Sequence, residues 1–239
     1  VELTIEEFVE GQPIAEAVCT DQVRRRQLAE ILLKIHNIRS PRPGPTWLES
    51  HGADPLRGAL DKAPELLDRI HRQWPNIPPH EINLCLTWLR EKIAQRPIPE
   101  FYELVHGDFH RNNFKMTPDG EIAMIDLGAM TYGYFESDLV DARWGFIDQP
   151  WWEGFCADYF AVNPQGRERF ERYASLFFGL FYLNKASVRA VRNRKSLEKN
   201  RPEAAEFHRA KGQRYWNLLL AAMEGEPLRR DLLFEIDDD

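Results

Sequence analysis

Asp108, Asn113 and Asp126 carry the side chains best suited to metal-assisted chemistry in this sequence. Carboxylate and amide oxygens are hard ligands, which suit Mg²⁺ better than zinc. Mg²⁺ held by few protein groups completes its octahedron with waters and substrate phosphates. A further carboxylate near such an ion can accept a proton from a hydroxyl group. The set therefore indicates phosphoryl transfer, which needs positioning, charge neutralisation and a proton acceptor.

A predicted β-hairpin, with strands at residues 113–116 and 121–125, brings these side chains together. The two runs flank Thr117-Pro118-Asp119-Gly120, a sequence typical of tight turns. One metal ligand begins the first strand and the other follows the second. All three side chains are therefore expected at the open end of one small β-element.

The rest of the sequence is mostly helical in pattern. Thr20-Asp21 predicts the start of a helix that ends near Asn37, with apolar residues recurring at helical spacing. Further helices are predicted near 58–73, 80–95, 136–148, 150–161, 167–192 and 202–223. Shorter features are a strand at 1–9, a turn at 10–13, an irregular connection at 39–55 and an apolar run at 101–105. The predicted fold class is α+β, mostly helical, with a small central β-hairpin.

Composition excludes several classes of protein. The 239 residues are 43% hydrophobic and 29% charged, which argues against disorder and against a collagen-like repeat. Three widely spaced cysteines fit neither a disulfide scaffold nor a metal-ligand spacing and suggest a reducing compartment. The sequence has no apolar run of membrane-spanning length and no signal-peptide pattern. We therefore expect a cytoplasmic protein without a membrane span.

The charge is unevenly distributed along the chain. The net charge of -7 argues against a general nucleic-acid binder. Residues 185–214 contain ten Lys/Arg against three Glu, whereas residues 126–158 contain seven Asp/Glu against one Arg. Solvated helix faces are one explanation for both stretches. Recognition of a cationic small molecule by the acidic stretch is the alternative.

The order His106-Gly107-Asp108, Asn113, hairpin, Ile125-Asp126 resembles the aminoglycoside phosphotransferase and choline kinase superfamily. Members of that superfamily share the C-terminal lobe of the protein kinases. The resemblance implies a catalytic loop at 106–113, with Asp108 as the catalytic base. It also implies Asn113 and Asp126 as Mg²⁺ ligands and ATP as co-substrate, since Asp126-Leu127-Gly128 stands where the kinase DFG motif stands.

The resemblance extends to residues around the loop. Asp138-Leu139 is similar to the family's later Asp-Leu pair, which implies that Asp138 braces the catalytic loop. His106 is similar to the family histidine that anchors this loop. The helix ending Leu32-Leu33-Lys34-Ile35-His36 is similar to the family's helix before the substrate region.

Four residues are nucleotide-binding candidates under this resemblance. Glu7 and Val9 lie in a segment similar to the hinge, where backbone groups hold the adenine. Phe114 and Ile125 would form the apolar floor under the adenine. Core residues of a hairpin would have the same pattern, so that alternative stays open.

The family's N-terminal lobe has no counterpart in the sequence. No glycine precedes Gly11 and no lysine precedes Lys34, whereas the family uses a phosphate-covering loop and a strand lysine. Residues 1–12 would be the last N-lobe strand and hinge, and 13–235 the C-lobe, with a helical part at 136–224 and an acidic tail at 236–239. We expect the N-lobe in a longer form of this protein or in another chain, unless the protein works without one.

The leading functional hypothesis is a kinase that phosphorylates a hydroxyl of a small, cationic molecule such as an amino sugar or amino alcohol. Candidate substrate-binding residues lie in the acidic stretch; they are Asp141, Trp144, Asp148 and Glu153, with Trp151 and Trp152 as further aromatic faces. Tryptophans at helical spacing are also typical core residues.

Two alternatives remain. A C-lobe without an N-lobe could be a non-catalytic binding module whose basic stretch contacts an anionic partner. A protein or a lipid-linked sugar could also be the phosphate acceptor. The short segment between Asp126 and the next predicted helix has no activation-loop pattern, which favours small molecules.

Overall fold

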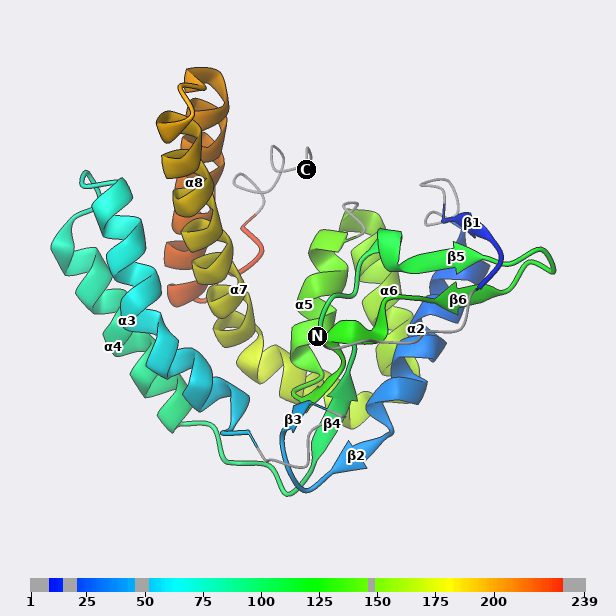
Figure 1. Ribbon diagram of the computed structural model, residues 1–239. Helices are drawn as coiled ribbons and strands as arrows, with labels where there is room; N and C mark the ends of the chain where they lie inside the picture. Colours follow the sequence, from blue (N-terminus) through cyan, green and yellow to red (C-terminus); the bar gives the residue numbers. More distant parts are fainter. Residues whose placement is uncertain (1–8, 15–20, 46–51, 146–148, 230–239) are drawn as a thin grey trace. The chain divides into compact units, whose positions relative to one another are not determined.

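The computed structural model describes residues 9–14, 21–45, 52–145 and 149–229 (Figure 1). The chain divides into two compact units, one formed by residues 1–55 and 99–171 and the other by 56–98 and 172–239. Small antiparallel sheets accompany many helices, so the fold is α+β, as predicted. In the described part of the chain, no helix combines the length and the apolarity that a bilayer crossing requires.

The first unit contains both sheets and the helices around them. Its strands are β1 (Gln12–Pro13), β2 (Arg39–Ser40), β3 (Gly44–Pro45), β4 (Tyr102–Val105), β5 (Phe114–Met116), β6 (Ile122–Met124) and β7 (Thr131–Gly133). Its helices are α2 (Gln22–His36), α5 (Glu136–Gly145), α6 (Gln149–Val162) and the start of α7 (Pro164–Glu198). Two single-turn 3₁₀ segments, Arg111–Asn113 and Leu127–Ala129, precede β5 and β7.

Helix α2 begins where the sequence predicts. Asp21 accepts a hydrogen bond from the Val23 amide over 2.8 Å, which satisfies one of the free N–H groups of the first turn. Leu28 and Leu32, one turn apart, are fully buried. This apolar face lies along α6, which covers α2 in the same unit.

The hairpin β5–β6 forms around the predicted turn, with Phe114 opposite Met124. One expectation about the neighbouring segment is wrong. The segment expected to be only a turn places Gln12 and Pro13 in strand β1, which pairs with the outer edge of β5. Proline lacks an N–H group, so its place at a sheet edge costs no ladder hydrogen bond.

The connection expected to be irregular, residues 39–55, contributes two short strands. Strands β2 and β3 join a four-stranded sheet in the order β2-β4-β7-β3. The expected return to helix after Asp126 is also wrong, because β7 comes first and pairs with both β3 and β4. These strands have two to four residues and form through pairing with distant segments, so no local periodicity in the sequence predicts them.

The second unit is helical in its described part. It consists of α3 (Pro55–Gln73), α4 (Pro79–Ala94), the rest of α7 and α8 (Pro202–Met223). All four helices agree with the predicted ranges to within a few residues, apart from the longer ends of α7. Trp216 on α8 donates to Glu81 on α4 over 2.9 Å. A Cβ at Gly212 would overlap the Trp74 ring, so glycine allows this close approach.

Candidate active site

The loop 106–113 connects β4 to β5 and carries the predicted base. Its backbone turns at Gly107, which has a φ of +79°. A Cβ at this position would lie 2.7 Å from the carbonyl oxygen of Ala129. Glycine is therefore needed both for the backbone conformation and for the contact with the turn that follows Asp126.

Asp108 is held by two neighbours and yet remains accessible. Its Oδ2 accepts a hydrogen bond from Asn113 Nδ2 over 3.0 Å and lies 3.1 Å from His110 Nε2. The same Asn113 nitrogen donates to the Asp108 carbonyl over 2.8 Å. The side chain of Asp108 keeps 52% of its surface exposed. The carboxylate thus has a fixed orientation and an open face.

His110, to which the sequence assigned no role, lies beside the predicted base. Its Nδ1 accepts a hydrogen bond from the Asn112 amide over 3.2 Å, which leaves the ring hydrogen on Nε2. That hydrogen points at Asp108. The only signal for this contact in the sequence is that His110 lies two residues after Asp108. A histidine in a loop is otherwise expected to be a solvated side chain.

Asp126 follows β6 at the same end of the hairpin. The Ile125 amide donates to the Asn113 carbonyl over 2.8 Å, so the two predicted metal ligands are adjacent across the hairpin. Asp126 has left-handed backbone angles, φ 58° and ψ 65°. Its exposed side chain makes no hydrogen bond or ion pair with any residue that the structure describes.

Asp138 is completely buried at the start of α5 and binds the backbone of the loop. Its two oxygens accept hydrogen bonds from the His106 amide over 2.7 Å and the Gly107 amide over 2.8 Å. His36 at the end of α2 lies with its Nε2 3.1 Å from Asp138 Oδ2. Because charged hydrogen bonds in a buried site are strong, this carboxylate fixes the backbone just before Asp108.

A third element reaches this cluster through His36. The Tyr159 hydroxyl on α6 lies 2.7 Å from His36 Nδ1. Burial raises the pKa of the Tyr159 phenol, so this group stays protonated and donates to the ring. A buried chain of hydrogen bonds therefore runs from Tyr159 through His36 to Asp138 and the loop.

His106 is fully buried below the loop. Its Nδ1 accepts from the Asp108 amide over 3.2 Å, and its Nε2 lies 3.4 Å from the Ile125 carbonyl oxygen. The ring also packs beside Phe109 and Phe114. His106 thus links the backbone of the two segments that carry Asp108 and Asp126.

The nucleotide-binding candidates differ in their surroundings. Phe114 is fully buried, with its ring 4.9 Å from that of Phe109, so its side chain has no surface with which to contact adenine. The hairpin-core alternative accounts for it. Ile125 and Val9 are half-buried, and the Val9 carbonyl accepts a hydrogen bond from Lys115 over 2.9 Å. Glu7 lies outside the described residues.

The substrate-binding candidates are also dispersed. Trp151 and Trp152 are buried and stack near Phe155, so they belong to the core and offer no aromatic face to a ligand. Glu153 is exposed on α6. The other candidates are Asp141 and Trp144, both half-buried on α5, and Asp148, outside the described residues.

A family model described as the phosphotransferase enzyme family, APH, matches residues 3–173 of the chain. The chain belongs to this family. The match includes the loop 106–113, the hairpin and Asp138. No curated protein matches the chain.

Solved structures of several kinases share the fold of this family member. The amicoumacin kinase hAmiN, solved with AMP-PNP, Ca²⁺ and Ami, superposes with a TM-score of 0.60 at 16% identity, over 94% of this chain and 65% of its own. A choline/ethanolamine kinase family protein from Mesorhizobium loti superposes with a TM-score of 0.53 at 15% identity, over 91% of this chain and 70% of its own. The choline kinase LicA from Streptococcus pneumoniae superposes with a TM-score of 0.54 at 16% identity, over 88% of this chain and 69% of its own. At these identities the likeness establishes the kinase-like fold.

The donor atoms of the family member fit Mg²⁺ at the open end of the hairpin. Asn113 uses its nitrogen for Asp108, which leaves the amide oxygen without a hydrogen bond among the described residues. The Asp126 carboxylate is exposed and likewise makes no hydrogen bond among the described residues. No cluster of three His, Cys, Asp or Glu side chains in the described ranges could hold a metal. One carboxylate and one amide are nevertheless the sparse set that Mg²⁺ uses together with phosphates and water.

Proposed function

We propose that this chain is the catalytic part of an ATP- and Mg²⁺-dependent kinase that phosphorylates a hydroxyl of a small molecule. The observation that supports it is the convergence of His110 and Asn113 on Asp108. The two side chains orient a carboxylate that is still half exposed, next to the hairpin end that carries Asp126.

Asp108 would hold the acceptor hydroxyl and take its proton. The hydroxyl oxygen then forms a bond to the γ-phosphorus of ATP, the bond to the bridging oxygen breaks, and ADP leaves with that electron pair. General-base assistance of this kind contributes roughly 10²–10⁴-fold to the rate. Mg²⁺ held by Asn113 and Asp126 would supply neutralisation of phosphate charge. Asp138 and His106 keep the loop in the geometry that the transfer requires.

A cationic acceptor such as an amino alcohol or amino sugar is the substrate class that we favour. The acidic stretch 126–158 supports it, because carboxylates attract ammonium groups. Glu153 and Asp141 are the candidate carboxylates on α6 and α5. Structural relatives also include a choline kinase, an ethanolamine kinase and a protein solved in complex with GDP and kanamycin.

The test is ADP release by the intact protein in the presence of ATP or GTP, Mg²⁺ and a panel of choline, ethanolamine and kanamycin. We expect acceptor-dependent turnover that Asp108→Asn lowers at least a hundredfold. Asp61→Asn, which changes an exposed carboxylate on α3, is the matched control and keeps full turnover. Turnover that survives Asp108→Asn would contradict the assignment of the base.

Nucleotide binding is tested separately by calorimetric titration with ATP, with and without Mg²⁺. We expect Mg²⁺-dependent binding that Asp126→Asn abolishes. Binding that is absent in the intact protein would instead favour a non-catalytic binding module.

A further inference from the structure

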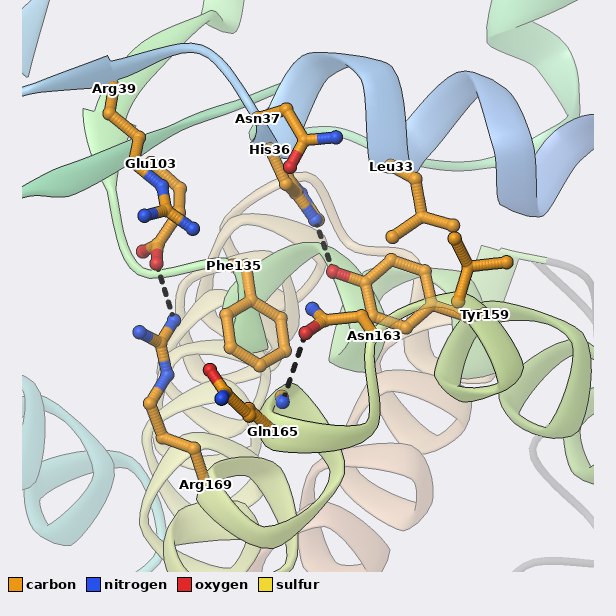
Figure 2. A pocket seen from close by; sticks show the side chains of 12 residues that line it. Leu33, His36, Asn37, Arg39, Glu103, Phe135, Tyr159, Asn163, Gln165 and Arg169 are labelled. Atoms are coloured by element: carbon orange, nitrogen blue, oxygen red, sulfur yellow. Dashed lines mark hydrogen bonds and ion pairs between the residues drawn. The ribbon is translucent and has the colours of Figure 1, made fainter.

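A polar cavity of about 280 Å³ lies within the first unit (Figure 2), and its lining includes His36 and Tyr159 but not Asp108, Asn113 or Asp126. Side chains from α2, β4, α6 and α7 line it. One buried water molecule needs only roughly 10–15 Å³ of such space. The cavity is therefore large enough for a small organic molecule.

Glu103 on β4 contributes a carboxylate to the lining of this cavity. Only 8% of its side-chain surface is exposed. The Oε1 atom pairs with Arg169 on α7 over 2.8 Å. The Oε2 atom is buried and accepts no hydrogen bond from any residue in the described part of the chain. A buried carboxylate oxygen without a donor is costly, so a donor supplied from outside would stabilise it.

Arg169 cannot neutralise the Glu103 carboxylate fully, because it also forms an ion pair with a second carboxylate. Its Nε lies 3.2 Å from Oε1 of the buried Glu136, and its guanidinium covers the Phe135 ring at 4.2 Å. The same guanidinium thus faces two buried carboxylates. Arg169, Glu103 and Glu136 together carry one excess negative formal charge, and Arg39 is a further cationic side chain in the cavity lining.

Arg39 is the nearest alternative source of that charge along the sheet. It is the direct partner of Glu103 in the register of β2 and β4. Arg39 is nevertheless exposed, and the structure contains no ion pair between the two. The Oε2 atom of Glu103 therefore has no donor in the described part of the chain.

We propose that this cavity binds a small organic cation with N–H donors, a primary ammonium or a guanidinium group, through Oε2 of Glu103. The amide side chains of Asn37, Asn163 and Gln165 line the same cavity and can bond to the polar remainder of the ligand. This assignment is independent of the proposed kinase reaction, because it uses none of the residues assigned to that reaction.

The test is calorimetric titration of the full chain with methylguanidinium and with ethylammonium. An Asp108→Asn/Asp126→Asn background removes acceptor or metal binding at the candidate active site. We expect saturable binding that this background retains. Tetramethylammonium has the same charge and no N–H donor, and should bind at least tenfold more weakly.

Three variants complete the test. Glu103→Gln should weaken binding at least tenfold. Val162→Trp, which adds bulk at an exposed lining residue, should do the same without altering Glu103, so the test holds even if the first variant fails to fold. Arg39→Ala removes a competing positive charge and should leave affinity equal or higher. Failure of both cations to bind the full chain, or unchanged affinity in Val162→Trp, would overturn the proposal. Preferential binding of sulfate that depends on Arg39 would also overturn it.

Discussion

The ring of His110 directs its Nε2 hydrogen at Oδ2 of Asp108, 3.1 Å away, while the Asn112 amide fixes the opposite ring nitrogen. This arrangement makes His110 a positioning residue for the proposed base. We expect His110→Ala to lower kcat by roughly tenfold to a hundredfold with little change in KM, because a misplaced base loses rate and not ground-state binding.

The conservative variant His110→Gln keeps a donor near the same place and should recover part of the loss. Steady-state kinetics with the acceptor found in the ADP-release screen would show this. An effect on KM alone, or no recovery by glutamine, would mean that His110 acts elsewhere.

Asp138 should matter for stability as well as activity. Asp138→Asn offers one oxygen where the wild-type carboxylate offers two, so the amide of His106, which is buried, or that of Gly107 loses its acceptor. We expect the free energy of unfolding in urea to fall by about 1–3 kcal/mol, the usual cost of an unsatisfied buried donor. Asp61→Asn is the matched control and should leave unfolding unchanged. A decrease equal to that of the control would show that Asp138 does not support the loop.

The left-handed backbone of Asp126 makes a comparison of two inactive variants informative. Asp126→Ala and Asp126→Gly both remove the carboxylate, so both should abolish Mg²⁺-dependent ATP binding. They should differ in stability, because alanine resists a φ of 58° and glycine does not. We expect Asp126→Gly to be more stable by about 1 kcal/mol in thermal unfolding. Equal stabilities would indicate that this backbone conformation is not maintained.

Cys85 should be unreactive in the folded protein. Burial raises the pKa of its thiol to about 12, against about 9 for the free group. Because the folded pKa is the higher one, stability from this group is intact below pH 9 and declines between pH 9 and 12. We expect iodoacetamide at pH 9 to label Cys85 far more slowly in the native chain than in urea, as peptide mass spectrometry can measure. Equal rates would contradict the burial of this thiol.

The sequence was informative where local chemistry decides the structure. The Asp21 cap, the Pro118-Asp119-Gly120 turn and the helical periodicities each depend on residues that are close in the chain, and all form as predicted. The convergence of Asp108 and Asn113 also follows from a short loop.

What the sequence did not reveal depends on distant partners. Strand β7 has three residues and no periodicity, and it exists because β4 and β3 pair with it. The burial of Trp151 is decided by the helices around α6 and not by its neighbours in sequence. His36 and Asp138 meet although 102 residues separate them, and no spacing rule predicts such a contact.

The Asp138 contacts also set an order of events during synthesis of the chain. A ribosome that has released residues up to 126 has already delivered Asp108, Asn113 and Asp126, but the amides of His106 and Gly107 still lack their acceptor. Those amides can become protected from hydrogen exchange only after Asp138, 31 residues beyond Gly107, has emerged and α5 has docked. Protection of the Gly107 amide from hydrogen exchange therefore reports when α5 has docked against the catalytic loop.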